Sequence, residues 1–402
     1  TPPPNPKCPI VYGRFASNRE KAKTLIVYAG HYDVQPAEPL EEWKSPPFAA
    51  EIKGGKIFAR GAIDHKGPPM AVISAIDSIQ STAGSLPLNI FVIIEGEEEI
   101  GSPSLVPFVQ KHGDELKKAD GVYYCGTGQR HPEKTELSLG PKGPLNLEFE
   151  VRVRDSNVHS GNKPMLDSAA WRLVWAFATM VDPNEKILVE GFNDDLKPPT
   201  KQEIELLKPL VAKMDEDELR KRLGNTPKFS RNLHGLELLK AYCFEPTINI
   251  SGIQSGYVGP RFQNIATAFA EARVDCRLPP DIDPDDAFQK IRAHLDKQGF
   301  QDIVVRKTGG YPASTTPYDA EVVQALLRSY RRFNLEIDVW PRSGGSSPHH
   351  VFARPPLNLP VVSGGLGWGH GEHSPNEYID LEGYRVAIKH HATFFLELAG
   401  AI

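Results

Sequence analysis

Two apolar runs constrain the fold of this chain more than any other feature of its sequence. They lie at Lys23–Ala29 (K-T-L-I-V-Y-A) and Leu88–Ile94 (L-N-I-F-V-I-I), and both are rich in β-branched or aromatic residues. Continuous apolar runs of this length are typical of strands that are buried on both faces of a parallel sheet. The sequence therefore predicts a buried sheet as the centre of the fold.

The segments around these runs have the periodicity of helices. A helix is predicted from Pro68 or Pro69, which suit a first helical turn. Its apolar residues recur at helical spacing, namely Met70, Ile73, Ile76 and Ile79. A second helix at Pro103–Leu116 and a third strand at Gly121–Cys125 complete a β-α-β-α-β order, which indicates an α/β fold with a mixed, mostly parallel sheet flanked by helices.

A smaller α+β domain is predicted to be inserted into this fold. From Leu147–Val153 (L-E-F-E-V-R-V) onward, apolar and charged residues alternate as in a half-exposed sheet. We expect its elements at Ser168–Val181, Lys201–Leu223 and Asp285–Gln298 (helices), and at Thr247–Ile253 and Ala266–Leu278 (strands). Buried-strand and helix patterns resume after residue 310, at Ala320–Phe333, Leu359–Val362 and Leu381–Leu398. We therefore expect a catalytic domain at residues 1–142 and 310–402 and an inserted lid or dimerisation domain at residues 143–309.

Composition excludes several classes of protein. The 402 residues carry a net charge of -5 with no Lys/Arg cluster, so we expect no nucleic-acid partner. No apolar stretch approaches the ~20 residues that a bilayer requires, so we expect no membrane span. The four cysteines lie far apart, which favours buried thiols over a disulfide framework and favours a cytoplasmic location. The first residue is Thr1 and not Met, so we expect a processed or trimmed N-terminus.

Chemically reactive residues follow the predicted strands, where open α/β sheets place their active sites. His31 and Asp33 lie two positions apart in G-H-Y-D-V-Q-P, as a metal ligand and its orienting carboxylate do. A capped turn with an exposed histidine explains this pair equally well. Asp64, in G-A-I-D-H-K-G, is a second candidate ligand, although a helix N-cap is an alternative role for it.

Four carboxylates within five residues follow the second apolar run, in E-G-E-E-E-I-G-S at Glu95–Ser102. They repel one another, so a bound cation is one explanation and a solvated acidic turn is another. Two further imidazoles, His370 and His373, lie in the glycine-rich segment G-H-G-E-H-S-P-N-E at Gly369–Glu377.

These four motifs, in this order, resemble the co-catalytic metallopeptidase family. That family includes carnosine and other cytosolic dipeptidases, glutamate carboxypeptidase, aminoacylase and succinyl-diaminopimelate desuccinylase. The similarity spans nearly the whole chain. D-V-Q-P, the following Trp43 and H-S-G at His159–Gly161 make the dipeptidase branch the most similar. The resemblance implies a zinc-exopeptidase-like catalytic domain that cleaves the amide bond of a small peptide with a metal-activated water.

The resemblance also implies a role for individual residues. Asp64 would bridge two divalent ions, Zn or Mn, with His31 on one ion and Glu99 and His373 on the other. Glu98 would be the general base, and Asp33 would orient His31. His159 would reach the active site of a partner subunit, which implies a homodimer formed through the inserted domain. The substrate would be bound by a further set, namely Asn264, Arg277, Gly345 and Ser346. For His159 and Arg277, ordinary turn and surface positions are the alternatives.

One position departs from the family pattern. Where the family has an acidic ligand after the third strand, this chain has Gly126, and Asp120 precedes the strand at its opposite end. We therefore expect one firmly bound ion at Asp64, Glu99 and His373, and a weak or empty site at His31. Two alternatives to a dipeptidase follow: a deacylase or desuccinylase acting on an N-acyl amino acid, or a catalytically impaired relative that binds metal or peptide.

Overall fold

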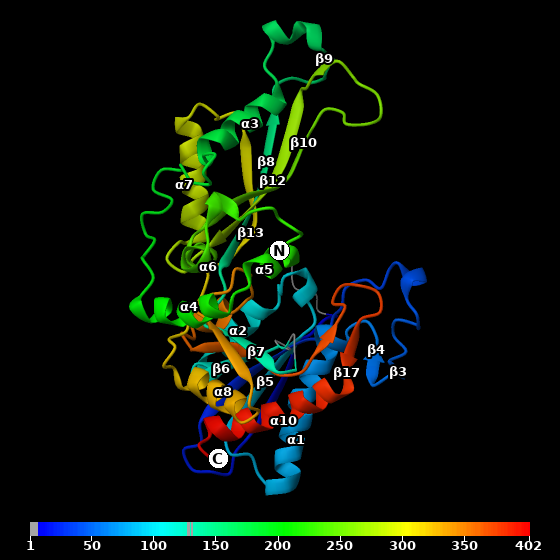
Figure 1. Ribbon diagram of the computed structural model, residues 1–402, viewed down its shortest axis with the longest axis vertical. Coiled ribbons are helices and arrows are strands. Elements are labelled where there is room, and N and C mark those ends of the chain that lie inside the picture. The colour runs from blue at the N-terminus through cyan, green and yellow to red at the C-terminus, as the bar shows by residue number, and fades with distance from the viewer. Residues whose placement is uncertain (1–6, 127–128, 130–131) are drawn as a thin grey trace. The chain divides into compact units, whose positions relative to one another are not determined.

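A computed structural model of the protein describes residues 7–126, 129 and 132–402 and divides the chain into two compact units (Figure 1). Unit 1 comprises Thr1–Gly140, Ser314–Arg342 and Pro348–Ile402, and unit 2 comprises Pro141–Ala313 and Ser343–Ser347. The segment 143–309 that we expect as an insertion lies within unit 2. Ser343–Ser347, which we expected in the catalytic domain, also belongs to unit 2.

Unit 1 is built on a seven-stranded, mostly parallel sheet with the order β1-β5-β2-β6-β15-β7-β14. Its strands are β1 (Val11–Phe15), β2 (Thr24–His31), β5 (Asn89–Glu95), β6 (Gly121–Cys125), β7 (Lys134–Ser138), β14 (Glu336–Trp340) and β15 (Val361–Gly364). The strand β2 is parallel to both β5 and β6, whereas β1 is antiparallel to β5. The predicted mixed α/β fold is thereby confirmed.

Helices cover both faces of this sheet, which explains why β2, an inner strand, is apolar from Leu25 to Ala29. Ile26 and Tyr28 pack in one cluster with α2 (Leu105–Leu116) and α9 (His350–Ala353). Alternate side chains of a strand point to opposite faces. Leu25 and Val27 therefore face the side where α1 (Gly67–Ala83) contacts β2 and α10 (Leu381–Leu398) packs against α1 and α8 (Glu321–Arg331).

A second, four-stranded sheet in unit 1 joins segments that are far apart in the sequence. Its order is β16-β17-β4-β3, with β16 (Gly369–His370), β17 (Tyr378–Asp380), β4 (Lys56–Phe58) and β3 (Glu51–Lys53). The remaining helical turns of unit 1 are η1 (Leu40–Glu42), η2 (Ala62–Lys66) and η3 (Glu98–Ile100). Pairing of β17 with β4 brings the segment after His373 next to the segment before Asp64.

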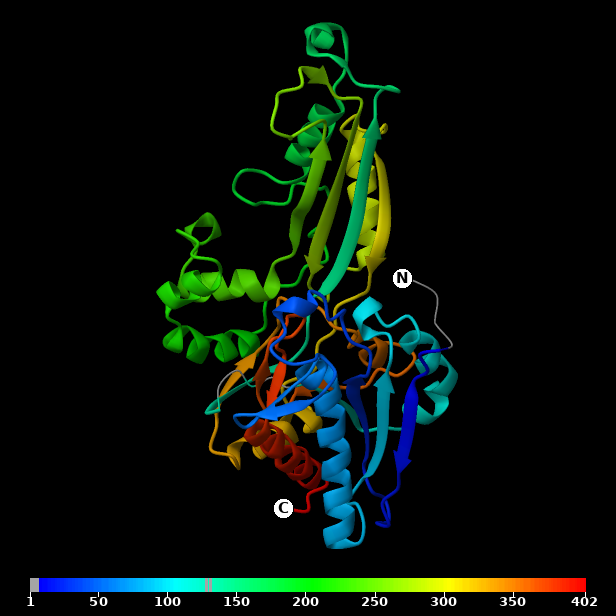
Figure 2. The same ribbon diagram turned by 90° about the vertical axis from the view of Figure 1, so that its right-hand side faces the viewer.

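Unit 2 is an antiparallel sheet, order β10-β12-β8-β13, with helices packed on one face (Figure 2). Its strands are β8 (Gly143–Arg152), β9 (Val158–His159), β10 (Thr247–Ser255), β11 (Ile265–Ala266), β12 (Phe269–Leu278) and β13 (Val304–Gly310). Its helices are η4 (Ser160–Met165), α3 (Ala169–Met180), α4 (Lys201–Lys213), α5 (Glu216–Arg222), η5 (Ser230–Asn232), α6 (Gly235–Phe244) and α7 (Pro284–Lys297). The alternation in β8 matches the half-exposed sheet that its sequence predicts.

Three local expectations are wrong, each for a physical reason. Met70 is exposed, because α1 turns Ala71, Val72 and Ala75 toward the core instead. The stretch at 201–223 is two helices, because the Asp215 side chain accepts two backbone N–H groups and starts a new helix. The strand expected at 266–278 is divided into β11 and β12, which pair with different partners.

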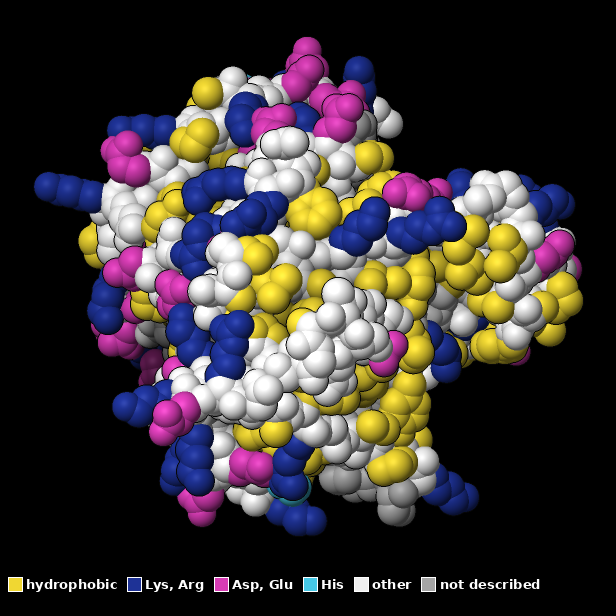
Figure 3. Space-filling model, turned by 90° about the horizontal axis from the view of Figure 1, so that it is seen from below, with side chains coloured by type: hydrophobic (Ala, Val, Ile, Leu, Met, Phe, Trp, Pro, Cys, Tyr) yellow, Lys and Arg dark blue, Asp and Glu magenta, His cyan; other side chains and the backbone are white. Residues whose placement is uncertain are grey.

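Among the helices of the described ranges, none has both the length and the hydropathy needed to cross a bilayer. On the face drawn in Figure 3, Lys and Arg side chains lie among Asp and Glu side chains.

Three buried histidines of unit 1, His349, His390 and His391, make its stability depend on pH. Burial lowers the pKa of His391 to about 3 and, together with the neighbouring His350, that of His349 to about 3. The unfolded chain takes up protons near the ordinary histidine value, about 6.5, while the folded chain does not. Stability is therefore complete above that value and is lost progressively as pH falls toward 3.

We expect each such histidine to lower the free energy of unfolding by about 2 kcal/mol between pH 6.5 and pH 5. Urea unfolding at pH 7 and pH 5 measures this loss. His391→Gln removes one titrating group, so its loss over the same interval should be smaller by about that amount. An equal loss in the variant and the unchanged protein would contradict the assignment.

Candidate active site

The parallel pairing of β2 and β5 places the first and third motifs side by side. His31 ends β2 and is paired with Glu95, which ends β5, and the N–H of Tyr32 donates to the Glu95 carbonyl at 2.8 Å. The turn η3, which carries Glu98 and Glu99, follows directly after β5. The carboxyl ends of two parallel strands thus bring an imidazole and an acidic turn together.

Asp33 connects His31 to that acidic turn. Its carboxylate oxygens accept the backbone N–H groups of Glu98 (3.3 Å) and Glu99 (3.0 Å). One of them also lies 3.2 Å from Nδ1 of His31. Burial acts to raise the pKa of Asp33, but the hydrogen bonds from His31 and from the Glu99 N–H outweigh it and lower the pKa. The Asp33 carboxylate is therefore placed to orient His31.

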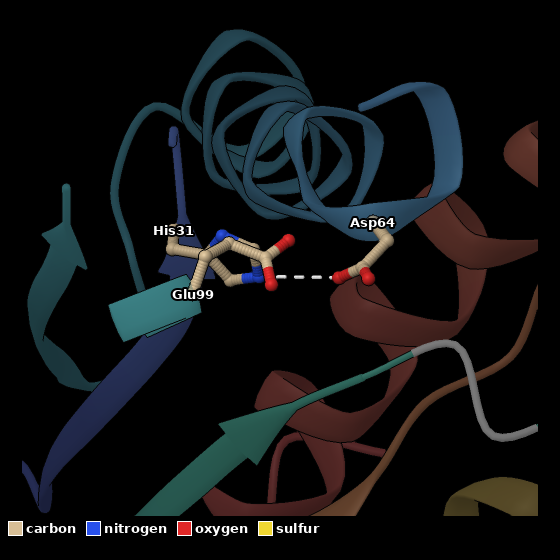
Figure 4. A group of neighbouring side chains, drawn as sticks. All are labelled: His31, Asp64 and Glu99. Carbon is tan, nitrogen blue, oxygen red and sulfur yellow. Dashed lines mark hydrogen bonds and ion pairs between the residues drawn. The ribbon is translucent and has the colours of Figure 1, made fainter. Parts of the chain in front are cut away.

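The carboxylate of Asp64 lies between two imidazoles. Its Oδ1 is 3.1 Å from Nε2 of His31, and its Oδ2 is 2.9 Å from Nε2 of His373. Glu99 completes the group, with Oε2 3.4 Å from Nε2 of His373. Figure 4 shows the side chains of His31, Asp64 and Glu99 pointing toward one another. One donor atom from each of these three lies within 4.8 Å of the others.

A divalent cation fits this group of donors. Oε1 of Glu99 is buried and has no hydrogen-bond partner among the described residues, so this part of the chain leaves an anionic oxygen unpaired. Burial acts to lower the pKa of His31, yet hydrogen bonds to Asp33 and Asp64 raise it to about 10. The site therefore attracts positive charge strongly, and a cation can replace the proton. Imidazole and carboxylate donors suit Zn or Mn.

Glu98 lies beside this group, farther from His31 than Asp64 is. Its Oε2 is 3.9 Å from Nε2 of His31, and a third of its side chain is exposed. Burial raises the pKa of Glu98, and the neighbouring carboxylates of Glu99 and Asp64 raise it further, against the opposing effect of His31. A partly exposed carboxylate with a raised pKa is suited to exchange protons with water.

The other two acids of the same motif are turned into the protein. Glu95 is fully buried and accepts hydrogen bonds from the hydroxyls of Tyr28 and Ser102. Burial raises its pKa to about 7. Glu97 is also buried and accepts from Ser104. Only two of the four carboxylates therefore face the site, which removes much of the repulsion expected from their spacing.

Two residues that support the ligands were missed by the sequence analysis. Gln35 donates to Oε2 of Glu99 at 2.9 Å, and D-V-Q-P contains it. The His65 ring is buried and stacks on His31 with centroids 5.2 Å apart. Burial lowers its pKa to about 4, so it stays neutral. A Cβ on Gly30 would lie 1.9 Å from the His65 ring, which explains the glycine in G-H-Y-D.

The structure leaves room for a side chain at Gly126. Its N–H donates to the Gly364 carbonyl at 2.9 Å, and a Cβ placed on it would meet nothing within 4 Å. Asp120 does not replace the expected ligand, because it accepts the N–H of Thr24 at the start of β2, whereas His31 ends that strand. The adjoining residues 127 and 128 lie outside the described part of the chain.

The predicted site residues of unit 2 form two groups, one of Arg277, Gly345 and Ser346 and the other of His159 and Asn264. Nη1 of Arg277 donates to the Ser346 hydroxyl at 2.7 Å, and the Lys142 N–H holds the carbonyl of Gly345 at 3.0 Å. His159 is paired with the residue after Asn264 in the β9–β11 ribbon, and the Asn264 carbonyl accepts the N–H of residue 160. The Arg277 group and the His159 group lie at opposite ends of β12, whose ten residues extend about 30 Å.

Comparison with known proteins places the chain in a family. The family model described as "Peptidase family M20/M25/M40" matches residues 27–397. A metallo-carboxypeptidase of that family from Sulfolobus solfataricus has a similar structure, with a TM-score of 0.86 and 34% identity over 98% of this chain and 88% of that one. The structure of human carnosine dipeptidase 1 gives a TM-score of 0.76 and 29% identity, covering 98% and 83%. A Cys-Gly metallodipeptidase of Candida albicans is 29% identical, covering 94% and 78%.

The match extends over nearly the whole chain, and a cation-binding group of donors lies beside a partly exposed glutamate, as the motifs predict. The chain therefore belongs to peptidase family M20/M25/M40 and is a metallopeptidase.

Proposed function

We propose that this chain hydrolyses the peptide bond of a dipeptide or a similarly small peptide, with Glu98 as general base. The observation that carries the proposal is the position of Asp64, whose two oxygens face His31 and His373 while Glu98 lies alongside. The relatives support the substrate class, since those compared above include a carnosine dipeptidase and a Cys-Gly metallodipeptidase.

Asp64, Glu99 and His373 would hold one divalent cation, Zn or Mn, and His31 with Asp64 would hold a second. A cation bound there polarises the substrate carbonyl and makes water more acidic. Glu98 takes the proton of the attacking water and then passes it to the leaving amine nitrogen. Its raised pKa suits both steps, because a carboxylate that is too weak a base would not accept the proton.

Arg277 and Ser346 are suited to bind the terminal carboxylate of the substrate. The planar guanidinium offers paired N–H donors that match a carboxylate, and the hydrogen bond to Ser346 fixes its orientation. The Gly345 backbone, held by Lys142, lies next to this pair and would contact the peptide main chain.

His159 is suited to stabilise the developing oxyanion. Its Nδ1 accepts the Gly161 N–H at 3.0 Å, so in the neutral ring the proton is on Nε2, which is free to donate. A dipeptide spans only about 7 Å, whereas Arg277 and His159 lie at opposite ends of β12 in one protomer. His159, with Asn264, would therefore serve the active site of a partner subunit.

An apolar surface of unit 2 supports a homodimer with a second copy as the partner. Trp171, Val174 and Trp175 lie on one face of α3 at helical spacing, and each is more than two-fifths exposed. The two indole rings stack on each other. The neighbouring β10 is an edge strand of its sheet, and its Ile250 and Ile253 are exposed. Two copies that pair through the edge strand β10 would cover both this edge and the apolar face of α3.

We propose a cytoplasmic location, because no disulfide joins the four cysteines, Cys8, Cys125, Cys243 and Cys276, which all lie in the described residues.

Glu98→Gln should lower kcat by a factor of about 10² to 10⁴, because the amide cannot accept the proton. Release of free amino acids from a dipeptide, with Mn or Zn added, measures the loss. Metal content should be unchanged, since Glu98 is not a proposed ligand. Glu372→Gln, an exposed glutamate next to His373, is the control and should keep full activity. If Glu98→Gln retained more than a tenth of the activity, the proposed base would be wrong.

Gly126→Asp should strengthen binding of the second cation about tenfold or more, since it supplies an anionic ligand where the structure has open space. Elemental analysis and calorimetric titration with Mn should find one tight ion in the unchanged protein and two in the variant. Gly126→Asn matches the size without the charge and should change binding much less. Two tightly held ions in the unchanged protein would refute the weak second site.

Heterodimers test whether His159 acts across subunits. A Glu98→Gln chain co-expressed with a His159→Ala chain, each with its own affinity tag, has one complete site and should show about half the normal activity. The reciprocal dimer carries both changes on one chain and none on the other, and it should be nearly inactive. If His159 served its own subunit, the reciprocal dimer would be the active one.

A further inference from the structure

A buried ion pair lies directly behind the turn that carries Asp64. Glu377 is fully buried, Arg60 is 3% exposed, and Nη1 of Arg60 donates to Oε2 of Glu377 at 2.7 Å. Both residues belong to unit 1. Removing two charges from water is expensive unless every oxygen and N–H finds a partner. The hydrogen bonds around this pair therefore show which segments it holds in place.

The Glu377 carboxylate accepts three backbone N–H groups of the Asp64 turn. Its Oε2 accepts the backbone N–H of Gly61 at 2.9 Å, and its Oε1 accepts those of Ile63 and Asp64, each at 3.0 Å. With Arg60 it has four donors, so both oxygens are satisfied. One of the four is the N–H of Asp64 itself, so the carboxylate fixes the backbone from which the candidate bridging ligand projects.

The same pair also contacts two of the other segments that carry candidate ligands. Nη2 of Arg60 donates to the Pro36 carbonyl at 3.2 Å, at the end of the G-H-Y-D-V-Q-P motif that contains His31. Glu377 lies four residues after His373, and its own carbonyl accepts the Ala59 N–H at 3.0 Å. Three segments that are distant in the sequence are therefore joined at one buried carboxylate and one guanidinium.

We propose that Glu377, neutralised by Arg60, is a positioning residue that sets the orientation of Asp64 toward His31 and His373. This inference rests on the proposed function, in which Asp64 holds the cation. Because Arg60 balances its charge and its oxygens are occupied by N–H donors, Glu377 does not itself compete for the cation. Glu377 holds the backbone of the turn, so that one oxygen of Asp64 faces His31 and the other faces His373.

The alternative is that the pair stabilises unit 1 and nothing more. Glu397 provides a matched control for that role. It is 5% exposed, lies in the same unit, and is paired with two arginines, Arg328 and Arg332. Its described partners include none of the candidate ligands. Glu397→Gln therefore removes a carboxylate that is also buried and paired with arginine, although its arginines are partly exposed, without touching the Asp64 turn.

The test is the affinity of the purified protein for Co²⁺, measured by calorimetry and by the visible absorption of the bound ion. Glu377→Gln replaces one oxygen by an amide donor that faces backbone N–H groups, so the turn cannot keep its position. We expect a 10- to 100-fold weaker affinity and an altered Co²⁺ spectrum, as for loss of a partner that orients a ligand. Glu397→Gln should lower the thermal midpoint and leave Co²⁺ affinity within twofold.

Arg60→Lys carries the test if Glu377→Gln does not fold. It keeps the positive charge but not the planar fork that joins Glu377 to Pro36. We expect several-fold weaker Co²⁺ binding from this variant, and Co²⁺ affinity equal to that of the unchanged protein overturns the proposal. If the unchanged protein bound no Co²⁺ and Asp64→Asn made no difference, the proposed function itself would fail. These two failures are therefore distinguishable.

Discussion

The arrangement of this site depends on one carboxylate that serves two imidazoles. Asp64 places one oxygen 3.1 Å from His31 and the other 2.9 Å from His373. Neither histidine is near Asp64 in the sequence, and neither belongs to the same secondary structure element. The separation of the two Nε2 atoms is therefore set by the span of a single carboxylate. Every segment that carries a candidate ligand therefore has to be fixed relative to the Asp64 carboxylate.

Two different kinds of contact hold these segments in place. The register of β2 and β5 fixes His31 against the acidic turn, because the parallel ladder continues to the last residue of both strands. The Asp64 turn has no such ladder. It follows β4 and precedes α1, and a buried carboxylate from the C-terminal region provides its backbone acceptors. A polar group deep in the protein is stable there because all its hydrogen bonds are formed.

The elements that depend on local patterns could be predicted from the sequence. The strand β6 and the helix α10 have the bounds that their apolar periodicity indicates, and β2 and β5 differ by one or two residues. The four motifs likewise indicated His31, Asp64, Glu99 and His373, which the structure brings together. Features that depend on contacts between distant segments could not be found this way. The inclusion of Ser343–Ser347 in unit 2 is one of them.

The acidic motif shows why proximity in sequence is a poor guide to shared function. Glu95, Glu97, Glu98 and Glu99 look alike in the sequence, but β5 and η3 turn the first two into the protein, where the hydroxyls of Tyr28, Ser102 and Ser104 donate to one oxygen of each. What distinguishes the four is the partner each one meets, and none of these partners is evident from the motif alone. Glu98 and Glu99 differ in the same way, since Gln35 holds Glu99 but not Glu98.

The balance of charge at the site makes the two proposed cation positions unequal. Asp64 and Glu99 supply two negative charges near His373, which match one divalent ion. On the His31 side, the charge of Asp33 is engaged by two backbone N–H groups and by His31 itself, and Gly126 supplies none. A second ion there would rely on His31 and on Asp64, whose charge is already shared. Glu98 is an effective base because it is not a ligand, since a bound ion would make its carboxylate a weaker base.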